Sequence, residues 1–287
     1  MMDFYIVIPA HNEQDTIGLT LESLVNQTLP PKRLIVVNDN SSDNTHQIIS
    51  KFTRKYDWIF SINITSSTEH IPGAKVINAF YEGLNTLDED YDIICKFDAD
   101  IIFPNSYLET LAMVFKSDKN IGIAGGIPYI KKSDRWVYET VASKNHVRGP
   151  IKSYRKGCFK DIGGLKKSVG WDSIDVLLAQ YFGWKVKTNK DLHVKHLKPT
   201  GKAYSKNTKT LRGEALYKMR FGFTLSIIAS IKSAFNKRSV SFFLNSIIGY
   251  FKAKKEKQVF LVNESQGKFI RQLHWKNIQK KYFKLYL

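Results

Sequence analysis

The sequence has little cysteine and no long apolar run, and both shortages narrow the class of protein. Two cysteines in 287 residues, Cys95 and Cys158, cannot build a disulfide framework, so we expect a protein of the reducing cytoplasm with both thiols in its core. We expect no secretory leader at the start of this sequence, because its first apolar segment is short and stops at Pro9. The apolar stretches of the last third reach only about 11 to 13 residues, whereas a bilayer span needs roughly 20.

Two glycine-rich loops are also missing. No G-x-G-x-x-G follows the first apolar segment, which argues against a dinucleotide-dependent dehydrogenase. The segment is followed by "PAHNEQ", which has neither the glycine nor the basic residue that a nucleotidyltransferase needs after its first strand. A nucleotidyltransferase, which would also join a nucleotide-binding sheet to acidic metal ligands, is therefore a disfavoured alternative.

Acidic residues are scarce in the last third of the chain. Residues 195–287 contain 21 Lys and Arg but 3 Asp and Glu, whereas residues 1–194 contain 23 of each kind. The net charge of +18 therefore lies in the last third and predicts an anionic partner. Lys and Arg flank the short apolar stretches there, which favours amphipathic helices on an anionic membrane surface over a helical appendage with solvated charges. No recognised nucleic-acid motif accompanies the charge, so we expect no nucleic acid.

Apolar, β-rich segments alternate with segments that carry apolar residues at helical spacing. The expected strands cover residues 4–10, 33–39, 59–65, 91–100 and 121–127, and the expected helices cover 14–27, 43–56, 73–87 and 105–118. This alternation predicts an α/β fold with a mostly parallel central sheet, flanked by helices. Ligands of such sheets bind beyond the carboxyl ends of the strands.

Polar residues follow three of the expected strands at that end. They are His11, Asn12 and Glu13 after the first strand, Asp39 and Asn40 after the second, and Asp98 and Asp100 at the end of the fourth. The spacing of Asp98 and Asp100 would place both carboxylates on one face of an extended segment. Two like charges so close repel unless a cation lies between them, so a divalent metal is one explanation. A strand end that opens a turn is the plainer one.

Three segments carry a resemblance when they are read in order. The segments "IVIPAHNEQDTIGLTLESLVNQT", "LIVVNDNSSDNT" and "CKFDAD" together resemble the family 2 glycosyltransferases with the GT-A fold, over about residues 4–200. The resemblance implies transfer of a sugar from a nucleotide-diphosphate donor to a hydroxyl acceptor, with inversion at the anomeric carbon. It also implies Mn²⁺ or Mg²⁺ at the Asp-x-Asp.

The resemblance further implies roles for single residues on the donor side. Asp39 matches the acid that hydrogen-bonds the base, whereas Asn38 and Asn40 replace the family's Asp and Gly; Asn tolerates the turn geometry. The residues that match nucleotide-sugar-binding positions are Pro9, Ala10, His11, Glu13, Asp39, Lys75, Asn78, Asp98 and Ala99. Of these, Lys75 matches a helix residue that meets donor phosphates, although a solvated lysine explains it equally well.

The acceptor side carries a second part of the resemblance, in "KGCFKDIGGLKKSVGWDSIDVLLAQYFGWKV". Asp172 aligns with the family's catalytic base, and Asp175, one helical turn further on, is the alternative base. Trp171 replaces the family's Glu at the neighbouring position. His196, in "HLKPTG", matches a histidine that touches the metal, so the implied metal ligands are Asp98, Asp100 and His196.

These observations combine into one expected organisation. A GT-A glycosyltransferase domain covers residues 1–204, with a nucleotide-binding half at about 1–125 and an acceptor half at about 126–204, and a basic amphipathic helical region covers 205–287. We expect a nucleotide-diphosphate sugar donor, UDP-linked first of all, and a glycan or lipid-linked acceptor in bacterial surface-polysaccharide synthesis. We expect the protein in the cytoplasm, peripheral on the inner face of the cell membrane.

A reading outside the enzymes stays open beside it. The chain could be a catalytically inactive, membrane-associated protein that binds nucleotide sugars or polyanions. Its function would then survive Asp100→Ala and Asp172→Asn.

Overall fold

The computed structural model describes residues 2–66, 73–140, 143–199 and 210–283. The chain divides into two compact units, which are taken separately below. The first unit combines Met1–Lys167 with Phe182–Lys202, and the second combines Ser168–Tyr181 with Ala203–Leu287. The segment 168–181, which we had grouped with the first domain by sequence, is thus counted with the C-terminal helices, and the domain boundary at 204 stays a prediction.

Four parallel strands form the first part of the sheet, as the alternating pattern predicts. Their order is β3-β2-β1-β4, and each pairs in parallel with its neighbour. The strands are β1 (Phe4–Ala10), β2 (Arg33–Asp39), β3 (Ile59–Ile64) and β4 (Ile93–Phe97). The helices between them are α1 (Ile17–Val25), α2 (Thr45–Lys55) and α3 (Ala74–Leu84). Each of these elements lies within two or three residues of the range expected from its apolar period.

The second part of the sheet is mixed, which the apolar pattern did not predict. β8 (Ile151–Arg155) pairs antiparallel with both β4 and β6 (Ile121–Lys132), so it separates them. β6 then pairs in parallel with β9 (Lys185–His196), and β9 pairs antiparallel with the short β5 (Ile101–Ile102). The remaining elements of this unit are β7 (Arg135–Tyr138), which pairs with β6, α4 (Tyr107–Ser117) and α5 (Lys156–Asp161).

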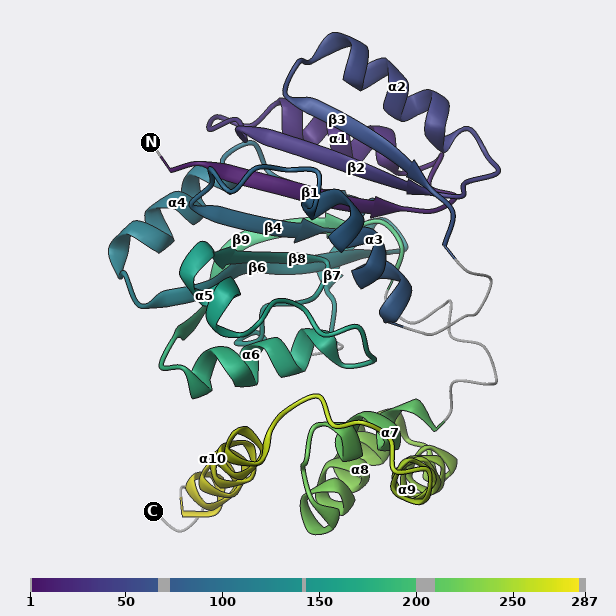
Figure 1. Ribbon diagram of the computed structural model, residues 1–287, viewed down its shortest axis with the longest axis vertical. Helices are drawn as coiled ribbons and strands as arrows, with labels where there is room; N and C mark the ends of the chain where they lie inside the picture. Colours follow the sequence, from purple (N-terminus) through teal and green to yellow (C-terminus); the bar gives the residue numbers. More distant parts are fainter. Residues whose placement is uncertain (1, 67–72, 141–142, 200–209, 284–287) are drawn as a thin grey trace. The chain divides into compact units, whose positions relative to one another are not determined.

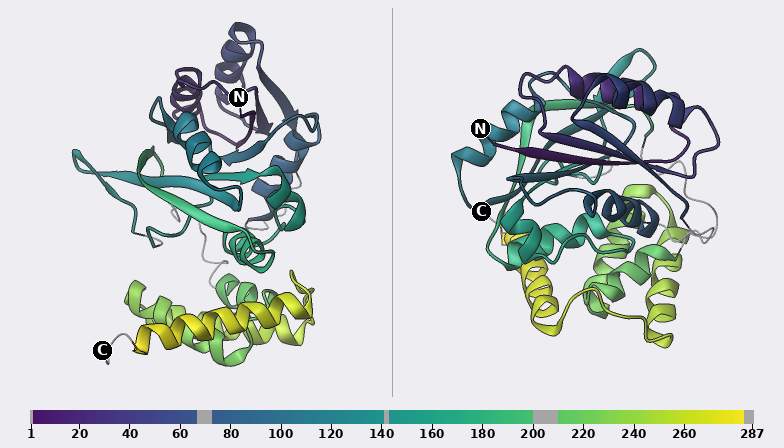
Figure 2. Two further views of the ribbon diagram at one scale, coloured as in Figure 1. Left: turned by 90° about the vertical axis from the view of Figure 1, so that its left-hand side faces the viewer. Right: turned by 45° about the horizontal axis from the view of Figure 1, so that its top comes forward.

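Helices cover both faces of this sheet, as Figures 1 and 2 show. One face carries Ile6 and Ile8 against Leu21 of α1 and Leu111 of α4, in a cluster of fully buried side chains. On the other face α3 comes so close that a Cβ on Gly83 would lie 2.6 Å from Val37 and 2.7 Å from Val7. The parallel strands are therefore buried on both faces, which explains their continuous apolar runs.

The second unit is helical. Its helices are α6 (Trp171–Tyr181), α7 (Leu211–Lys218), α8 (Phe223–Lys237), α9 (Val240–Lys255) and α10 (Glu264–Phe283). Helices α7 and α9 are in direct backbone contact, because a Cβ on Gly213 or Gly249 would lie 1.7 Å or 2.0 Å from a carbonyl oxygen of the facing segment. Helix α6 packs on α10, where the rings of Tyr181 and Phe269 meet edge to face at 5.5 Å.

The sequence composition predicted no disulfide framework and no membrane-spanning segment, and both predictions can be compared with this fold. Both cysteines are unbridged and buried, as predicted, and burial raises the pKa of the Cys95 thiol to about 12, far from that of a nucleophile. Across the ranges that the structure describes, none of the helices is both long and apolar enough to cross a membrane.

Candidate active site

The polar segments after β1 and β2 are tied to one another. His11 Nδ1 lies 2.6 Å from the carbonyl oxygen of Asp39, and the amide of Asn12 donates to the hydroxyl of Ser41 at 3.0 Å. The amide of Glu13 donates to the hydroxyl of Thr45 at 2.7 Å. The register of β1 on β2 sets this up, because Ala10 pairs with Asn38 and both strands end together. The sequence prediction that these segments meet is confirmed.

The loop after β2 is held in a left-handed turn. Asn40 has a φ of 51°, a conformation that favours glycine and that Asn tolerates better than most residues. Asp39 is buried, and its carboxylate accepts a hydrogen bond from the amide of Ser66 at 3.0 Å. Asn38 donates to the side chain of Asn63 at 2.7 Å, while its own buried Oδ1 has no hydrogen-bond partner among the described residues. Asn38 thus holds an unused acceptor atom inside this edge of the sheet.

Strand β4 ends at Phe97, so Asp98, Ala99 and Asp100 form a turn. The expectation that both carboxylates share one face of an extended strand is therefore wrong. Thr20 of α1 holds the turn from below: its hydroxyl donates to the carbonyl of Ala99 at 2.9 Å and accepts from the amide of Ile101 at 3.1 Å. These two hydrogen bonds fix the turn after β4. In this turn, the carboxylates of Asp98 and Asp100 have different partners.

The two acidic side chains have separate neighbours. Asp98 forms an ion pair with Lys96, whose side chain is almost wholly buried. Asp100 instead faces β9, where its Oδ2 lies 3.4 Å from Nε2 of His196. Pairing of Ile101 with His196 between β5 and β9 brings the two residues together. The structure thus joins Asp100 to His196, as the resemblance implied, and places Asp98 against a lysine.

His196 is fixed from its other side by a residue that the sequence reasoning missed. Its Nδ1 lies 3.0 Å from Oε2 of Glu139, which follows β7, and Arg148 donates to the same oxygen at 3.2 Å. Glu139 is 1% exposed and His196 3%. Neither Glu139 nor Arg148 lies in a recognisable sequence motif. Their burial, which marks them as functional candidates, is visible only in the structure.

Opposing effects act on the pKa of His196. Burial lowers it, but the hydrogen bonds and negative charges of Asp100 and Glu139 together raise it to about 9. The ring is therefore protonated at neutral pH in the metal-free protein. Its charge is balanced by two carboxylates in a site that excludes water.

A divalent metal fits the pair of Asp100 and His196. Two ligands about 2.1 Å from one ion, at a right angle, lie about 3 Å apart, close to the 3.4 Å between Oδ2 and Nε2. No group of three or more metal-binding side chains is preformed in the part of the chain that the structure describes. Sites for such ions often combine one or two protein ligands with substrate phosphates, so two ligands suffice. A mixed oxygen and imidazole set suits Mn²⁺.

The other residues predicted to bind the donor also lie in the sheet unit. Pro9 and Ala10 close β1. Lys75 and Asn78 are half-buried in the first turns of α3, which begins after Gly73. Glu13 accepts from Lys198 at 2.7 Å, so a lysine beyond β9 reaches the loop after β1.

The two candidate bases lie on α6, in the helical unit. Asp172 is half-buried, whereas Asp175 is 1% exposed and accepts from the amide of Val176 at 2.6 Å. In the same unit, burial lowers the pKa of Arg212 and the negative charge of Asp172 opposes that shift. Of the two carboxylates, Asp172 is the more accessible to an acceptor.

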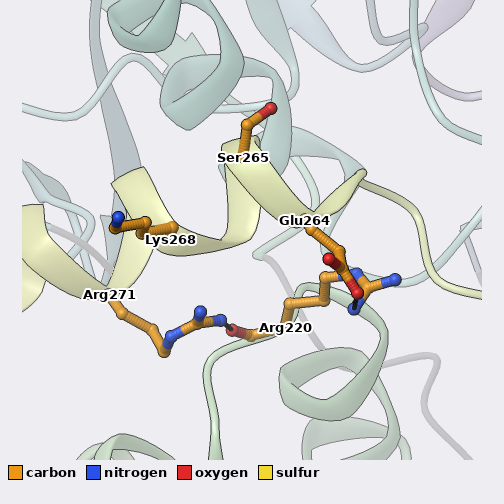
Figure 3. A pocket seen from close by; sticks show the side chains of 5 residues that line it. All are labelled: Arg220, Glu264, Ser265, Lys268 and Arg271. Carbon is orange, nitrogen blue, oxygen red and sulfur yellow. Dashed lines mark hydrogen bonds and ion pairs between the residues drawn. The ribbon is translucent and has the colours of Figure 1, made fainter.

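The helical unit also contains a basic pocket of ≈ 390 Å³, shown in Figure 3. It is lined by Arg220, Glu264, Ser265, Lys268 and Arg271. Its arginines serve the fold: Arg271 donates to the carbonyl of Arg220 at 2.8 Å, and Arg220 donates to the carbonyl of Val262 at 3.0 Å. The guanidinium of Arg220 also lies 3.7 Å from the ring centre of Phe260. We therefore infer that the residues of this pocket stabilise the helical unit rather than bind a ligand.

Curated relatives of the chain include sugar-polymer enzymes. The probable glycosyltransferase YdaM of Bacillus subtilis (strain 168) is 34% identical over 123 residues, which are 42% of this chain and 28% of YdaM. The poly-beta-1,6-N-acetyl-D-glucosamine synthase of Staphylococcus epidermidis is 24% identical over 199 residues, 63% of this chain and 44% of the synthase. The chain thus spans less than half the length of these two relatives.

Solved structures confirm the predicted GT-A-type fold. S. aureus TarS 1-349 in complex with UDP-GlcNAc superimposes with a TM-score of 0.58 at 19% identity, over 79% of this chain and 66% of that chain. The mannosyltransferase PcManGT from Pyrobaculum calidifontis in complex with GDP-Man and Mn²⁺ gives a TM-score of 0.54 at 13% identity, over 98% and 82%. The family model described as glycosyl transferase family 2 matches residues 5–162, more than half of the chain. The chain therefore belongs to glycosyltransferase family 2.

Proposed function

We propose that the chain is an inverting, metal-dependent glycosyltransferase that moves a sugar from a nucleotide-diphosphate donor to a glycan or lipid-linked hydroxyl. The observation that carries the proposal is the buried pair of Asp100 and His196 at the edge of the sheet, in a chain of family 2. The names of the bacterial relatives support a place in surface-polysaccharide synthesis.

On the donor side, the loops after β1 and β2 receive the nucleotide. Asp39 and the unpaired Oδ1 of Asn38 offer acceptors to the N–H groups of a base, and His11 and Glu13 shape the loop beside it. Lys75 and Asn78, at the start of α3, serve the donor phosphates. UDP is the first donor nucleotide to test, because TarS was solved with UDP and UDP-GlcNAc. GDP is the second, because PcManGT was solved with GDP-Man.

Asp100 and His196 hold Mn²⁺ or Mg²⁺ in this proposal. Asp98 lies in the same turn as Asp100 and forms an ion pair with Lys96. When bound, the ion neutralises charge on the departing diphosphate. Glu139 acts as a positioning residue, because it accepts the Nδ1 proton of His196 and thereby directs Nε2 toward Asp100. Arg148 in turn holds the carboxylate of Glu139.

Asp172 is the proposed general base, and Asp175 is its alternative. In an inverting transfer, the bond between the anomeric carbon and the diphosphate oxygen breaks, and its electron pair leaves with the diphosphate. The acceptor oxygen forms the new bond from the opposite side, and its proton passes to the base. The half-buried position of Asp172 suits that exchange better than the buried position of Asp175.

We further propose that the protein works in the cytoplasm, at the inner face of the cell membrane, through its basic C-terminal region. The excess of 21 Lys and Arg over 3 acidic residues in 195–287 supports an anionic surface as its partner. A lipid-linked acceptor would be presented at that surface.

The test is donor binding and donor hydrolysis across UDP-, GDP- and dTDP-sugars, with and without Mn²⁺. We expect one nucleotide class to bind in a Mn²⁺-dependent way, and Asp100→Ala to abolish that dependence. Asp172→Asn should lower kcat by about 100-fold or more while donor affinity is kept. Absence of binding to every donor would overturn the proposal, and full function of both variants would favour the inactive binding protein.

A further inference from the structure

Helix α9 has one buried side and, opposite to it, an exposed apolar side. Its buried side, formed by Ser246, Gly249 and Tyr250, faces the rest of the helical unit. On the opposite side of the helix, four and seven residues apart, Leu244, Ile248 and Phe251 are 54%, 57% and 47% exposed. A surface helix normally turns its apolar side toward the core, whereas α9 carries these apolar side chains in contact with solvent.

Helix α8 repeats this arrangement. Ser226 and Ser230 lie on its buried side, while Ile231 and Phe235 on the opposite side are 54% and 83% exposed. Ser239, which accepts a hydrogen bond from the amide of Phe242, caps the start of α9 directly after α8. The two helices therefore form a hairpin, with α8 and α9 labelled in Figure 1.

Eight of the 15 large apolar side chains that are exposed in the described part of the chain lie on α8 and α9. We define the α8–α9 face as Ile228, Ile231, Phe235, Val240, Leu244, Ile248 and Phe251, all of them exposed. The two most exposed members, Phe235 at 83% and Val240 at 76%, flank the turn between the helices. A groove of ≈ 660 Å³ on α9 is lined by two members of the face, Ile248 and Phe251, together with Ile247, Lys252, Lys255 and Glu256.

The charge around the face is mostly positive, although Glu256 lines the groove and Glu214 lies 3.9 Å from Lys252. Residues 223–255 contain six Lys and Arg and no Asp or Glu. Lysines at the end of α9 can lay their aliphatic stems along apolar surface while their ammonium groups reach phosphate. At the end of α8, the ammonium of Lys237 lies over the ring of Phe242, with Nζ 4.1 Å from the ring centre.

We propose that the α8–α9 face is the surface by which this protein docks on an anionic lipid bilayer. The inference deepens the membrane association proposed above and rests on it. Apolar side chains enter the boundary between headgroups and acyl chains, and the surrounding cations remain among the phosphates. Apolar side chains and cations on one surface favour an anionic bilayer over the other partners. A nucleic acid offers no apolar layer, and a second copy of the face would bring six positive charges against six more.

The test measures co-sedimentation of the full chain with vesicles of neutral phosphatidylcholine, with and without 30% phosphatidylglycerol. Leu244→Ser/Ile248→Ser removes two members of the face. Leu19→Ser/Met113→Ser is the matched control, because Leu19 and Met113 are 44% and 57% exposed on helices of the other unit. We expect the variant in the face to bind anionic vesicles at least about tenfold more weakly, and the control to bind like the unchanged protein.

A second pair of variants tests the charge. Lys232→Glu/Lys255→Glu alters two exposed lysines of the hairpin, and Lys51→Glu/Lys119→Glu makes the same change of net charge in the sheet unit. We expect roughly a 25-fold or larger loss of vesicle binding for the first pair and little change for the second. Equal losses for both pairs would overturn a localised surface and leave a general charge effect.

Other outcomes have definite meanings too. Binding to neutral vesicles as strong as to anionic ones, or no vesicle binding by the unchanged protein, would overturn the proposal. Self-association that disappears in Leu244→Ser/Ile248→Ser would instead assign the face to a second copy of the chain. Donor hydrolysis measured without vesicles keeps the two proposals apart, because the docking variants should leave it unchanged even if docking fails.

Discussion

Replacing Glu139 by Gln changes one atom in the support of His196 and leaves the proposed metal ligands, Asp100 and His196, unchanged. The native carboxylate lies 3.0 Å from Nδ1 of His196 and 3.2 Å from Arg148. An amide oxygen can still accept from Nδ1, but the hydrogen bond is no longer charge-assisted and is about half as strong. The amide can also turn its NH₂ group toward the ring, which would release the orientation of Nε2.

The expected loss follows from the role of such supports. Removing the partner of a metal-bound histidine lowers metal affinity by about 10- to 100-fold, which is about 1.4 to 2.7 kcal/mol. A second change should accompany it. Glu139 is one of the two groups that raise the pKa of His196 to about 9, so the pKa of the ring should fall in the variant. A merely structural role for Glu139 would not move that titration.

The assay is Mn²⁺ binding followed by electron paramagnetic resonance, in the presence of UDP and separately of GDP, with His196 titrated by NMR. Glu109→Gln is the control, because Glu109 is an exposed residue of α4 whose carboxylate accepts a hydrogen bond from the hydroxyl of Thr28 at 2.7 Å. The reasoning fails if Glu139→Gln binds Mn²⁺ within twofold of the unchanged protein. It also fails if Glu109→Gln loses as much affinity.

Three more outcomes follow from the same geometry. Asp100→Asn should weaken Mn²⁺ binding more than Asp98→Asn, because Asp98 faces Lys96 rather than His196; calorimetric titration with Mn²⁺ checks this, and equal losses would refute it. The raised pKa of His196 should stabilise the metal-free fold by on the order of 3 kcal/mol below pH 6.5, and this should disappear between pH 6.5 and about 9; urea unfolding across that range measures it. Gly249→Ala should destabilise the helical unit by about 1–3 kcal/mol because its Cβ would meet a carbonyl oxygen at 2.0 Å, whereas Gly18→Ala, at an ordinary 3.5 Å contact in α1, should not; thermal unfolding separates them.

The parallel part of the fold could be predicted because its signals are local. Each strand from β1 to β4 is an apolar run, and each helix between them carries apolar residues at helical spacing. The tolerance of Asn40 for a glycine position was also predictable from residue chemistry, and its φ of 51° bears that out. Such features depend on a few neighbouring residues, so one sequence is enough to show them.

The mixed part of the sheet could not be read in the same way. β8 lies between β4 and β6, yet its sequence "IKSYR" has only one residue of the usual apolar kind and carries no sign of its antiparallel partners. Glu139 and Arg148 escaped notice for the same reason, since their partners are 57 and 9 residues away. The expected strand 91–100 ran past its end at Phe97, because Thr20, which bonds to the following turn, lies 79 residues before Ala99.

The pair of Asp100 and His196 illustrates how strand register completes a motif. On β9 the buried residues are Leu192, Val194 and His196, while His193 and Lys195 point to solvent. A slip of one residue between β9 and its neighbours would exchange these sets and put a lysine beside Asp100. The register is held by β5 on one side and by β6 on the other, where Gly126 comes so near that a Cβ would lie 2.1 Å from the carbonyl oxygen of Leu192. The small residues and short strands that fix the register of β9 therefore determine the proposed ligand pair of Asp100 and His196, as much as the Asp-x-Asp does.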